Sequence, residues 1–156
     1  MAVEFSEQMQ KAINKLRRRI NDTDQSSPVY QDEELYDLIA DAVDELELHM
    51  YQKGRTVADG DFVRQGSGLP VTVTPAEMSL YVLQAALIFA MGTKAKADRD
   101  NFSLRKPNLS VDTSGQSADH AETIRILQDE IRRTLMNLVV INGAVHYYVG
   151  DDSGGL

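Results

Sequence analysis

The chain has 156 residues and no Cys, and its 24 acidic and 16 basic side chains give a formal net charge of −8. This length fits one domain with its own core, and the lack of Cys excludes a disulfide scaffold or a Cys-based zinc site. The acidic balance argues against a dedicated binder of nucleic-acid phosphates, which needs clustered Lys and Arg. The longest strongly apolar run, Leu80 to Met91, is shorter than the roughly 20 residues of a membrane span. We therefore expect a soluble protein without a secretory signal.

Two amphipathic helices are predicted in the first third of the chain. The first runs from Ser6 to Asn21, with Ser6 as the N-cap and a basic closing run, Lys15, Arg17, Arg18 and Arg19. The second starts near Asp32 and has an apolar stripe on one face. Its opposite face is acidic and includes Asp37, Asp41, Asp44 and Glu45. Because like charges on one face repel, that face is expected to meet water or a basic partner.

An insertion of β character is predicted at about 53–73. Asp59-Gly60 separates Arg55–Ala58 from Asp61–Arg64, which is the arrangement of a tight hairpin. The third helix then begins at Thr74-Pro75-Ala76-Glu77, a capping box with Pro at the first helical position. It is apolar on nearly every face, so we expect it to be central, and to end near Lys94 to Asp98.

A loop is predicted at about 98–113, where Phe102 and Leu104, and later Leu109 and Val111, alternate with polar residues as in short strands. The fourth helix carries an apolar stripe, Ile124, Leu127, Ile131, Leu135 and Leu138, and should stop at Asn142-Gly143. The expected fold class is thus mainly α. It comprises a four-helix, bundle-like domain at 1–143 and an extended, strand-like C-terminal arm at 144–156.

Motifs of catalysis and metal binding are weak in this sequence. The three histidines, His49, His120 and His146, form no HExxH pattern and no pair at a spacing of four. Glu45 lies four residues before His49, whereas the di-iron centres of bundles use a spacing of three. We predict no catalytic, metal or cofactor site, and therefore no enzyme.

Interaction surfaces are the stronger expectation. An unpaired terminal strand at Val145, His146, Tyr147, Tyr148 and Val149 needs a partner sheet, in this molecule or in another. Phe62 and Val63 of the hairpin are predicted to join the same interface with a neighbour. The basic cluster Lys15, Arg17, Arg18 and Arg19 is predicted to contact an acidic protein surface, such as the acidic helix of a second copy.

The order of these features resembles the head–tail connector (adaptor) proteins of tailed bacteriophages. The resemblance spans about Phe5 to Val139. It rests on the basic helix end with Asn21-Asp22, on Tyr30-Gln31-Asp32-Glu33-Glu34-Leu35, on Thr74-Pro75-Ala76-Glu77, and on the segment from Phe102 to Ser114 that leads into the last helix. It implies a structural virion protein at the neck, made in the host cytoplasm, with no cofactor and no membrane contact.

The resemblance also implies partners: the portal protein, neighbouring copies in a ring that is usually twelve-fold, and a stopper or tail-completion protein. Viral DNA would pass through the ring without sequence-specific binding. The acidic face, with Asp37, Asp41, Asp44 and Glu45, would line that channel and repel the DNA backbone. Two alternatives stay open: a small acidic regulator of the cytoplasm that mimics DNA or binds a partner, and, least favoured, a hydrolase using dispersed Asp, Glu and His.

Overall fold

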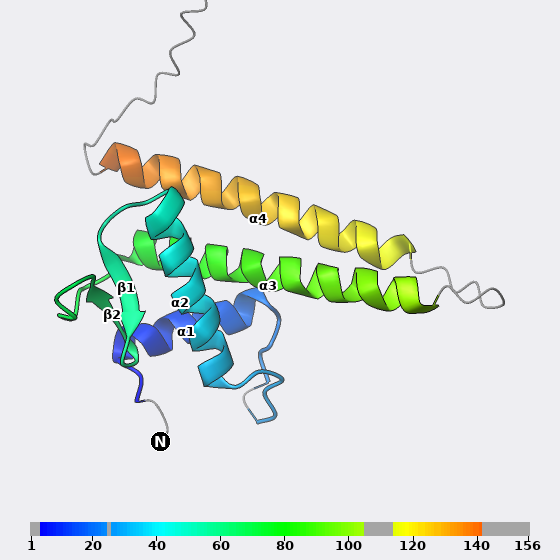
Figure 1. Cartoon of the computed structure of the whole chain (residues 1–156), viewed down its shortest axis with the longest axis horizontal. Helices are drawn as coiled ribbons and strands as arrows, with labels where there is room; N and C mark the ends of the chain where they lie inside the picture. The colour runs from blue at the N-terminus through cyan, green and yellow to red at the C-terminus, as the bar shows by residue number, and fades with distance from the viewer. Residues whose placement is uncertain (1–3, 25, 105–113, 142–156) are drawn as a thin grey trace, which may run out of the picture.

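The computed structural model describes residues 4–24, 26–104 and 114–141 of the chain. These residues form four helices and one two-stranded sheet (Figure 1): α1 (Glu7–Arg19), α2 (Asp32–His49), β1 (Arg55–Ala58), β2 (Asp61–Arg64), α3 (Pro75–Leu104) and α4 (Ser114–Ile141). The predicted mainly α fold, with a hairpin between the second and third helices, is confirmed. The C-terminal arm predicted at 144–156 lies outside the described residues.

The helix starts follow the capping signals of the sequence. Ser6 Oγ accepts a hydrogen bond from the Met9 amide at 3.2 Å, at the start of α1. At the start of α3, the Glu77 amide donates to Thr74 Oγ1 at 3.3 Å and the Thr74 amide donates to Glu77 Oε2 at 2.9 Å. This reciprocal pair is the predicted capping box, and it satisfies two amides that the helix itself leaves unpaired.

The hairpin pairs β1 and β2 antiparallel, with Val57 opposite Phe62 and Ala58 opposite Asp61. Both turn residues have positive φ, 50° at Asp59 and 78° at Gly60, which matches the type I′ turn that suits twisted strands. The Gly60 carbonyl accepts a hydrogen bond from the Ser6 amide at 3.0 Å. The turn is therefore hydrogen-bonded to the N-cap residue of α1.

The core is built around the first half of α3, against which α1, α2 and α4 all pack. Most α3 side chains from Met78 to Ala90 are buried, as an apolar helix without a polar face predicts. The predicted stripe of α4 packs here as well: Leu127, Ile131 and Leu138 are buried, and Ile124 and Leu135 are partly buried. The three other helices thus share α3 as a common centre.

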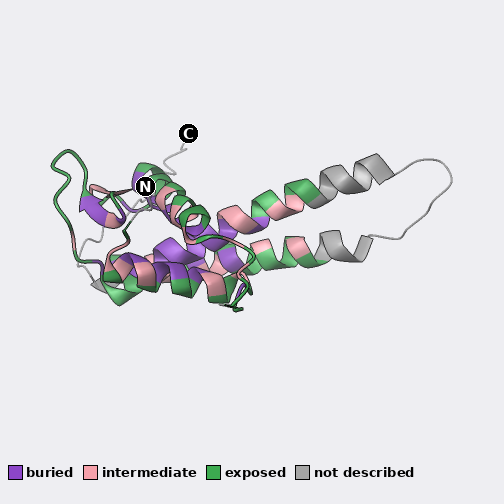
Figure 2. Cartoon of the chain, turned by 90° about the horizontal axis from the view of Figure 1, so that it is seen from below, coloured by how far each residue is buried: buried purple, intermediate pink, exposed green. Residues whose placement is uncertain are grey.

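The second half of α3 runs beside the first half of α4 as a two-helix projection (Figure 1). Buried residues are concentrated where α1, α2 and the hairpin meet α3 and α4, whereas most described side chains of the projection are exposed or intermediate (Figure 2). Among its described side chains, the projection contributes to the core only where α4 approaches the other helices, at Ile124 and Leu127.

The predicted end of the third helix near Lys94 to Asp98 is wrong, because α3 continues to Leu104. The short strand expected at Phe102 and Leu104 is accordingly helical. Between Gly92 and Leu104 the chain contains neither Gly nor Pro that could stop a helix, and two alternating apolar residues are too few to define a strand. The second predicted strand, at Leu109 and Val111, lies outside the described residues.

The apolar part of α3 is longer than the run from Leu80 to Met91 on which the sequence analysis relied. By length and composition, Pro75–Lys96 alone among the described helices could cross a membrane, with a mean hydropathy of 1.3 in its most apolar window. However, 61% of that window is buried inside the fold. Its apolar character is accounted for by the core that it forms.

Candidate functional site

An acidic stripe follows the outer face of α2. Its four predicted members, Asp37, Asp41, Asp44 and Glu45, are all exposed. Asp44 accepts a hydrogen bond from Thr56 Oγ1 of β1 at 2.9 Å, and Glu45 accepts one from Gln84 Nε2 of α3 at 3.0 Å. Within the described part of the chain, Asp37 and Asp41 have no hydrogen-bond or ion-pair partner. These two carboxylates are therefore the ones available to an outside charge.

A basic groove lies between α1 and the start of α3. It consists of two adjoining cavities of about 520 and 390 Å³ that share Lys15 and Arg18 in their linings. The apolar lining residues Val73, Met78 and Val82 come from α3 and the segment before it. Lys15 and Arg18 are exposed and have no ion-pair partner among the described residues, whereas Lys11 at the same groove is paired with Glu7 at 2.6 Å.

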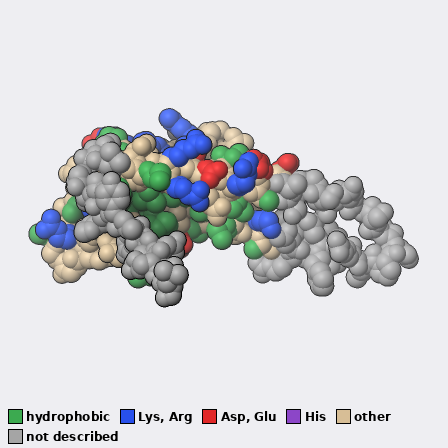
Figure 3. All heavy atoms as spheres, turned by 90° about the horizontal axis from the view of Figure 1, so that it is seen from above, with side chains coloured by type: hydrophobic (Ala, Val, Ile, Leu, Met, Phe, Trp, Pro, Cys, Tyr) green, Lys and Arg blue, Asp and Glu red, His purple; other side chains and the backbone are tan. Residues whose placement is uncertain are grey.

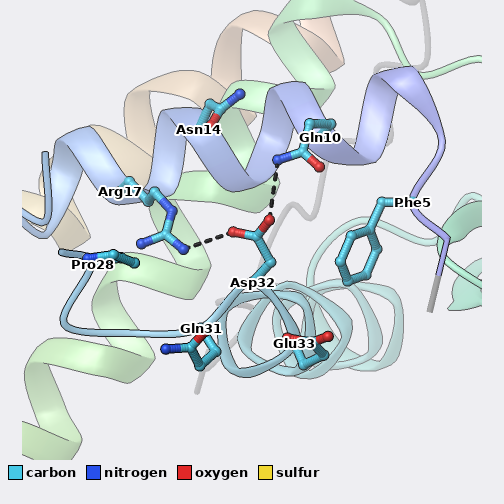
Figure 4. Close-up of a pocket in the computed structure, with 8 residues that line it drawn as sticks. All are labelled: Phe5, Gln10, Asn14, Arg17, Pro28, Gln31, Asp32 and Glu33. Atoms are coloured by element: carbon cyan, nitrogen blue, oxygen red, sulfur yellow. Dashed lines mark hydrogen bonds and ion pairs between the residues drawn. The ribbon is translucent and has the colours of Figure 1, made fainter. Parts of the chain in front are cut away.

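Arg17 belongs to a different structure from its basic neighbours. Its guanidinium pairs with Asp22, donates to the Tyr30 carbonyl at 2.8 Å, and donates to Asp32 Oδ1 at 2.7 Å. Figure 4 shows Asp32, at the start of α2, between Arg17 and Gln10 of α1. The Arg17 side chain is only 11% exposed and that of Asp22 only 3%. We call this group of contacts the Arg17 clamp.

The clamp corrects the assignment of Arg17 to an inter-subunit surface. Three acceptors within the chain already bind its guanidinium. Arg17 therefore fixes the loop between α1 and α2 and does not contact a neighbouring subunit. Arg19 is also partly engaged, since its Nη1 lies 2.9 Å from Glu130 Oε2 of α4. Of the predicted basic cluster, Lys15 and Arg18 alone remain uncommitted in the described residues.

The hairpin members of the predicted interface are also corrected. Phe62 is fully buried and stacks on Tyr81 of α3, with ring centroids 5.7 Å apart, and Val63 is 5% exposed. Both side chains are therefore buried within the subunit, and Phe62 belongs to its hydrophobic core. The remaining members, Val145, His146, Tyr147, Tyr148 and Val149, lie outside the described residues.

A buried polar cluster, which the sequence did not predict, joins the hairpin to α3. Arg55 Nη1 lies 2.8 Å from Glu77 Oε2, and the Tyr51 hydroxyl donates to Glu77 Oε1 at 3.0 Å. Burial, reinforced by the neighbouring Glu77 carboxylate, raises the pKa of Tyr51 well above 10, so its proton stays in place. The capping-box spacing marks Glu77 in the sequence, but nothing local marks its partners.

This cluster has the contacts of a structural tie. All three polar groups are used by one another or by the backbone, and none of them lines the cavities described above. Glu47 nearby accepts from the Lys53 and Gly54 amides, both at 2.7 Å, and so fixes the end of α2. Its Oε1 atom and the Oε1 atom of Gln84 are buried and have no hydrogen-bond partner among the residues that the structure describes.

Metal-ligating groups do not gather in the described residues. No set of three or more His, Asp and Glu side chains there is arranged to hold a metal ion. His49 is exposed at the end of α2, His120 is partly buried on α4, and His146 lies outside the described residues.

The outer face of α4 is mixed in charge. Figure 3 looks down on this side of the molecule and shows Lys and Arg interleaved with Asp and Glu and with hydrophobic side chains. The exposed large hydrophobic residues described on α4, namely Ile126, Met136 and Val139, are between 37% and 64% exposed. Charge is therefore segregated on α1 and α2 but not on α4.

A scan against protein-family models, a search of curated proteins and a search of solved structures each find no match to this chain.

Proposed function

We propose that this chain is a structural virion protein, a head–tail connector that assembles as a ring beneath the portal of a tailed phage. The observation that carries the proposal is the segregation of charge: the outer face of α2 is acidic, and the groove beside α1 is basic. The acidic face of α2 suits the lining of a DNA channel, and the basic groove lies on a different face, where it is available to a neighbouring copy in a head-to-tail ring. The order of sequence features, which resembles that of connector proteins, supports the same proposal.

In the proposed ring, the acidic stripe of α2 faces the DNA channel. Asp37 and Asp41 would present charges unused by the described part of the chain, whereas Asp44 and Glu45 are held by Thr56 and Gln84. Negative charge along a channel repels the phosphate backbone, so DNA would slide without sticking. This role needs no base-reading groups and no cofactor.

The outer parts of the subunit would meet the other neck proteins. We propose that the segment Val145 to Val149 docks to the portal, and that the opposite side of the ring receives the stopper or tail-completion protein. Twelve copies would match the portal ring. The protein would then be located in the virion neck.

Imaging the protein with its purified portal tests the proposal. We expect a ring coaxial with the portal, in which Asp37 and Asp41 lie nearer the axis than Lys15 and Arg18. A ring with these carboxylates on the outside would remove the channel assignment. Failure of the protein to dock, together with tight binding of α2 to a basic DNA-binding protein, would favour the acidic regulator instead.

A pair of charge variants tests the channel lining in assembled particles. Asp37→Lys combined with Asp41→Lys should slow DNA ejection and lower packaging yield, because the channel would attract phosphates. Glu122→Lys combined with Asp129→Lys makes the same change in net charge on α4, outside the proposed channel. Equal effects of the two double variants would contradict a specific role for the acidic stripe.

A further inference from the structure

One exposed apolar side chain stands out in the loop between α1 and α2. Val29 is 74% exposed, the largest fraction among the exposed large hydrophobic residues described. Acidic side chains lie on both sides of it in the chain, with Asp24 before it and Glu33 after it, and both are exposed. We call the described residues of this segment, Asp24 and 26–33, the acidic loop.

The side chain of Asp22 holds the backbone of the acidic loop in place. The Val29 amide donates to Asp22 Oδ1 at 3.0 Å, and the Tyr30 amide donates to Asp22 Oδ2 at 3.3 Å. Asp22 is in turn paired with Arg17 of the clamp. The Tyr30 ring meets Phe89 of α3 edge-on, with centroids 5.2 Å apart. An exposed apolar group on a fixed backbone loses little freedom on binding, which favours a contact surface.

The basic groove offers the complementary surface. Lys15 and Arg18 line it with positive charge that has no ion-pair partner among the described residues, and Val73, Met78 and Val82 line it with apolar atoms. An exposed apolar side chain on an acidic segment matches this pattern in both polarity and charge. A cavity of about 520 Å³ is ample for one Val side chain with its flanking backbone.

The loop does not reach the groove of its own subunit. The Arg17 clamp ties the loop to the side of α1 that faces α2, whereas Lys15 and Arg18 border α3. Figure 1 shows the loop at the end of α1 opposite the hairpin, while the larger cavity is lined by Thr72 and Val73, just after the hairpin. The two surfaces therefore point to different neighbours.

We propose that the acidic loop of one copy docks into the basic groove of the next copy, with Val29 as the apolar anchor between Lys15 and Arg18. The inference rests on the proposed ring and names the contact that would build it. The association is heterologous, so each subunit uses its loop on one side and its groove on the other. It uses neither Asp37 nor Asp41 and leaves both free for the channel.

Disulfide trapping tests the contact directly, and the absence of native Cys makes it clean. Val29→Cys protein is mixed with Ser79→Cys protein, since Ser79 lines the groove and is only partly buried. Under mild oxidation we expect a mixed dimer to form about ten-fold faster than with Leu48→Cys in place of Val29→Cys. Leu48 is a matched control because it is 68% exposed and lies at the far end of α2. Equal rates with the two partners would overturn the proposal.

A chain carrying both Val29→Cys and Ser79→Cys distinguishes the occupants. Docking between copies gives a ladder of head-to-tail oligomers, whereas an internal disulfide would show that the loop fills its own groove. In a parallel arm, labelled duplex DNA is titrated with the wild type and with the Lys15→Glu, Arg18→Glu double variant. DNA binding that only the wild type shows would assign the groove to nucleic acid and overturn the proposal.

The outcomes separate this inference from the proposed function. Rings on portal particles without the Val29–Ser79 cross-link would leave the connector in place and remove this contact. Cross-linked open chains that never dock to portal would leave the contact in place and remove the connector.

Discussion

Arg55 of β1 and Glu77 in the first turn of α3 form an ion pair, 2.8 Å between Nη1 and Oε2, in which Glu77 is also the capping-box residue of its helix. The Glu77 carboxylate thus contacts the Arg55 guanidinium of β1, the Thr74 amide at the start of α3 and the Tyr51 hydroxyl. The pair fixes the hairpin to the helix around which the core is built. Through it, the position of the turn at Gly60 and of the N-terminal segment depends on α3.

Removing the charge of Glu77 should destabilise the fold. Glu77→Gln keeps the shape but leaves the Arg55 guanidinium, only 17% exposed, without its counter-ion. Breaking a buried pair from one side costs about 3–5 kcal/mol, which urea denaturation would measure. Glu7→Gln is the matched control, because Glu7 pairs with Lys11 at 2.6 Å on an open surface and should leave the midpoint nearly unchanged. Equal losses would show that burial is not the deciding factor.

The same residue predicts an acid limit to stability. Burial alone would raise the pKa of Glu77, but the hydrogen bonds from Arg55, Thr74 and Tyr51 outweigh it and hold the pKa below its ordinary 4.5. A lowered folded pKa adds stability that is fully present above the unfolded pKa and is lost as pH falls through the folded pKa. Urea midpoints of the wild type should therefore fall below about pH 4.5, and those of Glu77→Gln should fall less. Parallel pH curves would contradict this.

Gly60 should resist substitution for steric as well as conformational reasons. A Cβ at Gly60 would lie 2.3 Å from the Glu4 carbonyl oxygen, and φ is +78°. Gly66 has a φ of +82° but open space around the added atom. Gly60→Ala should therefore cost more than Gly66→Ala by at least about 1 kcal/mol, since only the former combines strain with a backbone clash. Thermal or urea unfolding of both variants would measure the difference.

The elements that local sequence determines were predictable. Thr74-Pro75-Ala76-Glu77 and Asp59-Gly60 act through hydrogen bonds and φ angles within a few residues, so the helix start and the hairpin turn follow from the chain itself. The far end of α3 was not predictable in this way. A short alternation at Phe102 and Leu104 is compatible with a strand or a helix, and the packing of α3 against α4 is a tertiary contact that the local pattern does not show.

The candidate site shows where residue type ceases to be informative. Arg17 and Arg18 are adjacent and chemically identical, yet one is clamped by Asp22, Tyr30 and Asp32 while the other lines the groove. They differ because successive residues of a helix point in different directions, so that Arg17 faces α2 and Arg18 faces α3. Phe62 could have been recognised as core, because it lies opposite Val57 on one face of the hairpin and such pairs mark the buried side of a sheet.

The clamp itself provides a test that links stability to assembly. Arg17→Lys keeps the charge but cannot reach the Tyr30 carbonyl and both carboxylates together, because an ammonium lacks the guanidinium fork. Each charged hydrogen bond lost costs about 1.5–3 kcal/mol, and the loop that carries Val29 loses its support. We expect lower stability in urea and slower trapping between Val29→Cys and Ser79→Cys proteins. Arg18→Lys, one residue away and exposed, should leave stability unchanged within about 0.5 kcal/mol and trap at nearly the wild-type rate, since the groove keeps its charge. Unaltered trapping by a destabilised Arg17→Lys protein would show that loop rigidity is not what presents Val29.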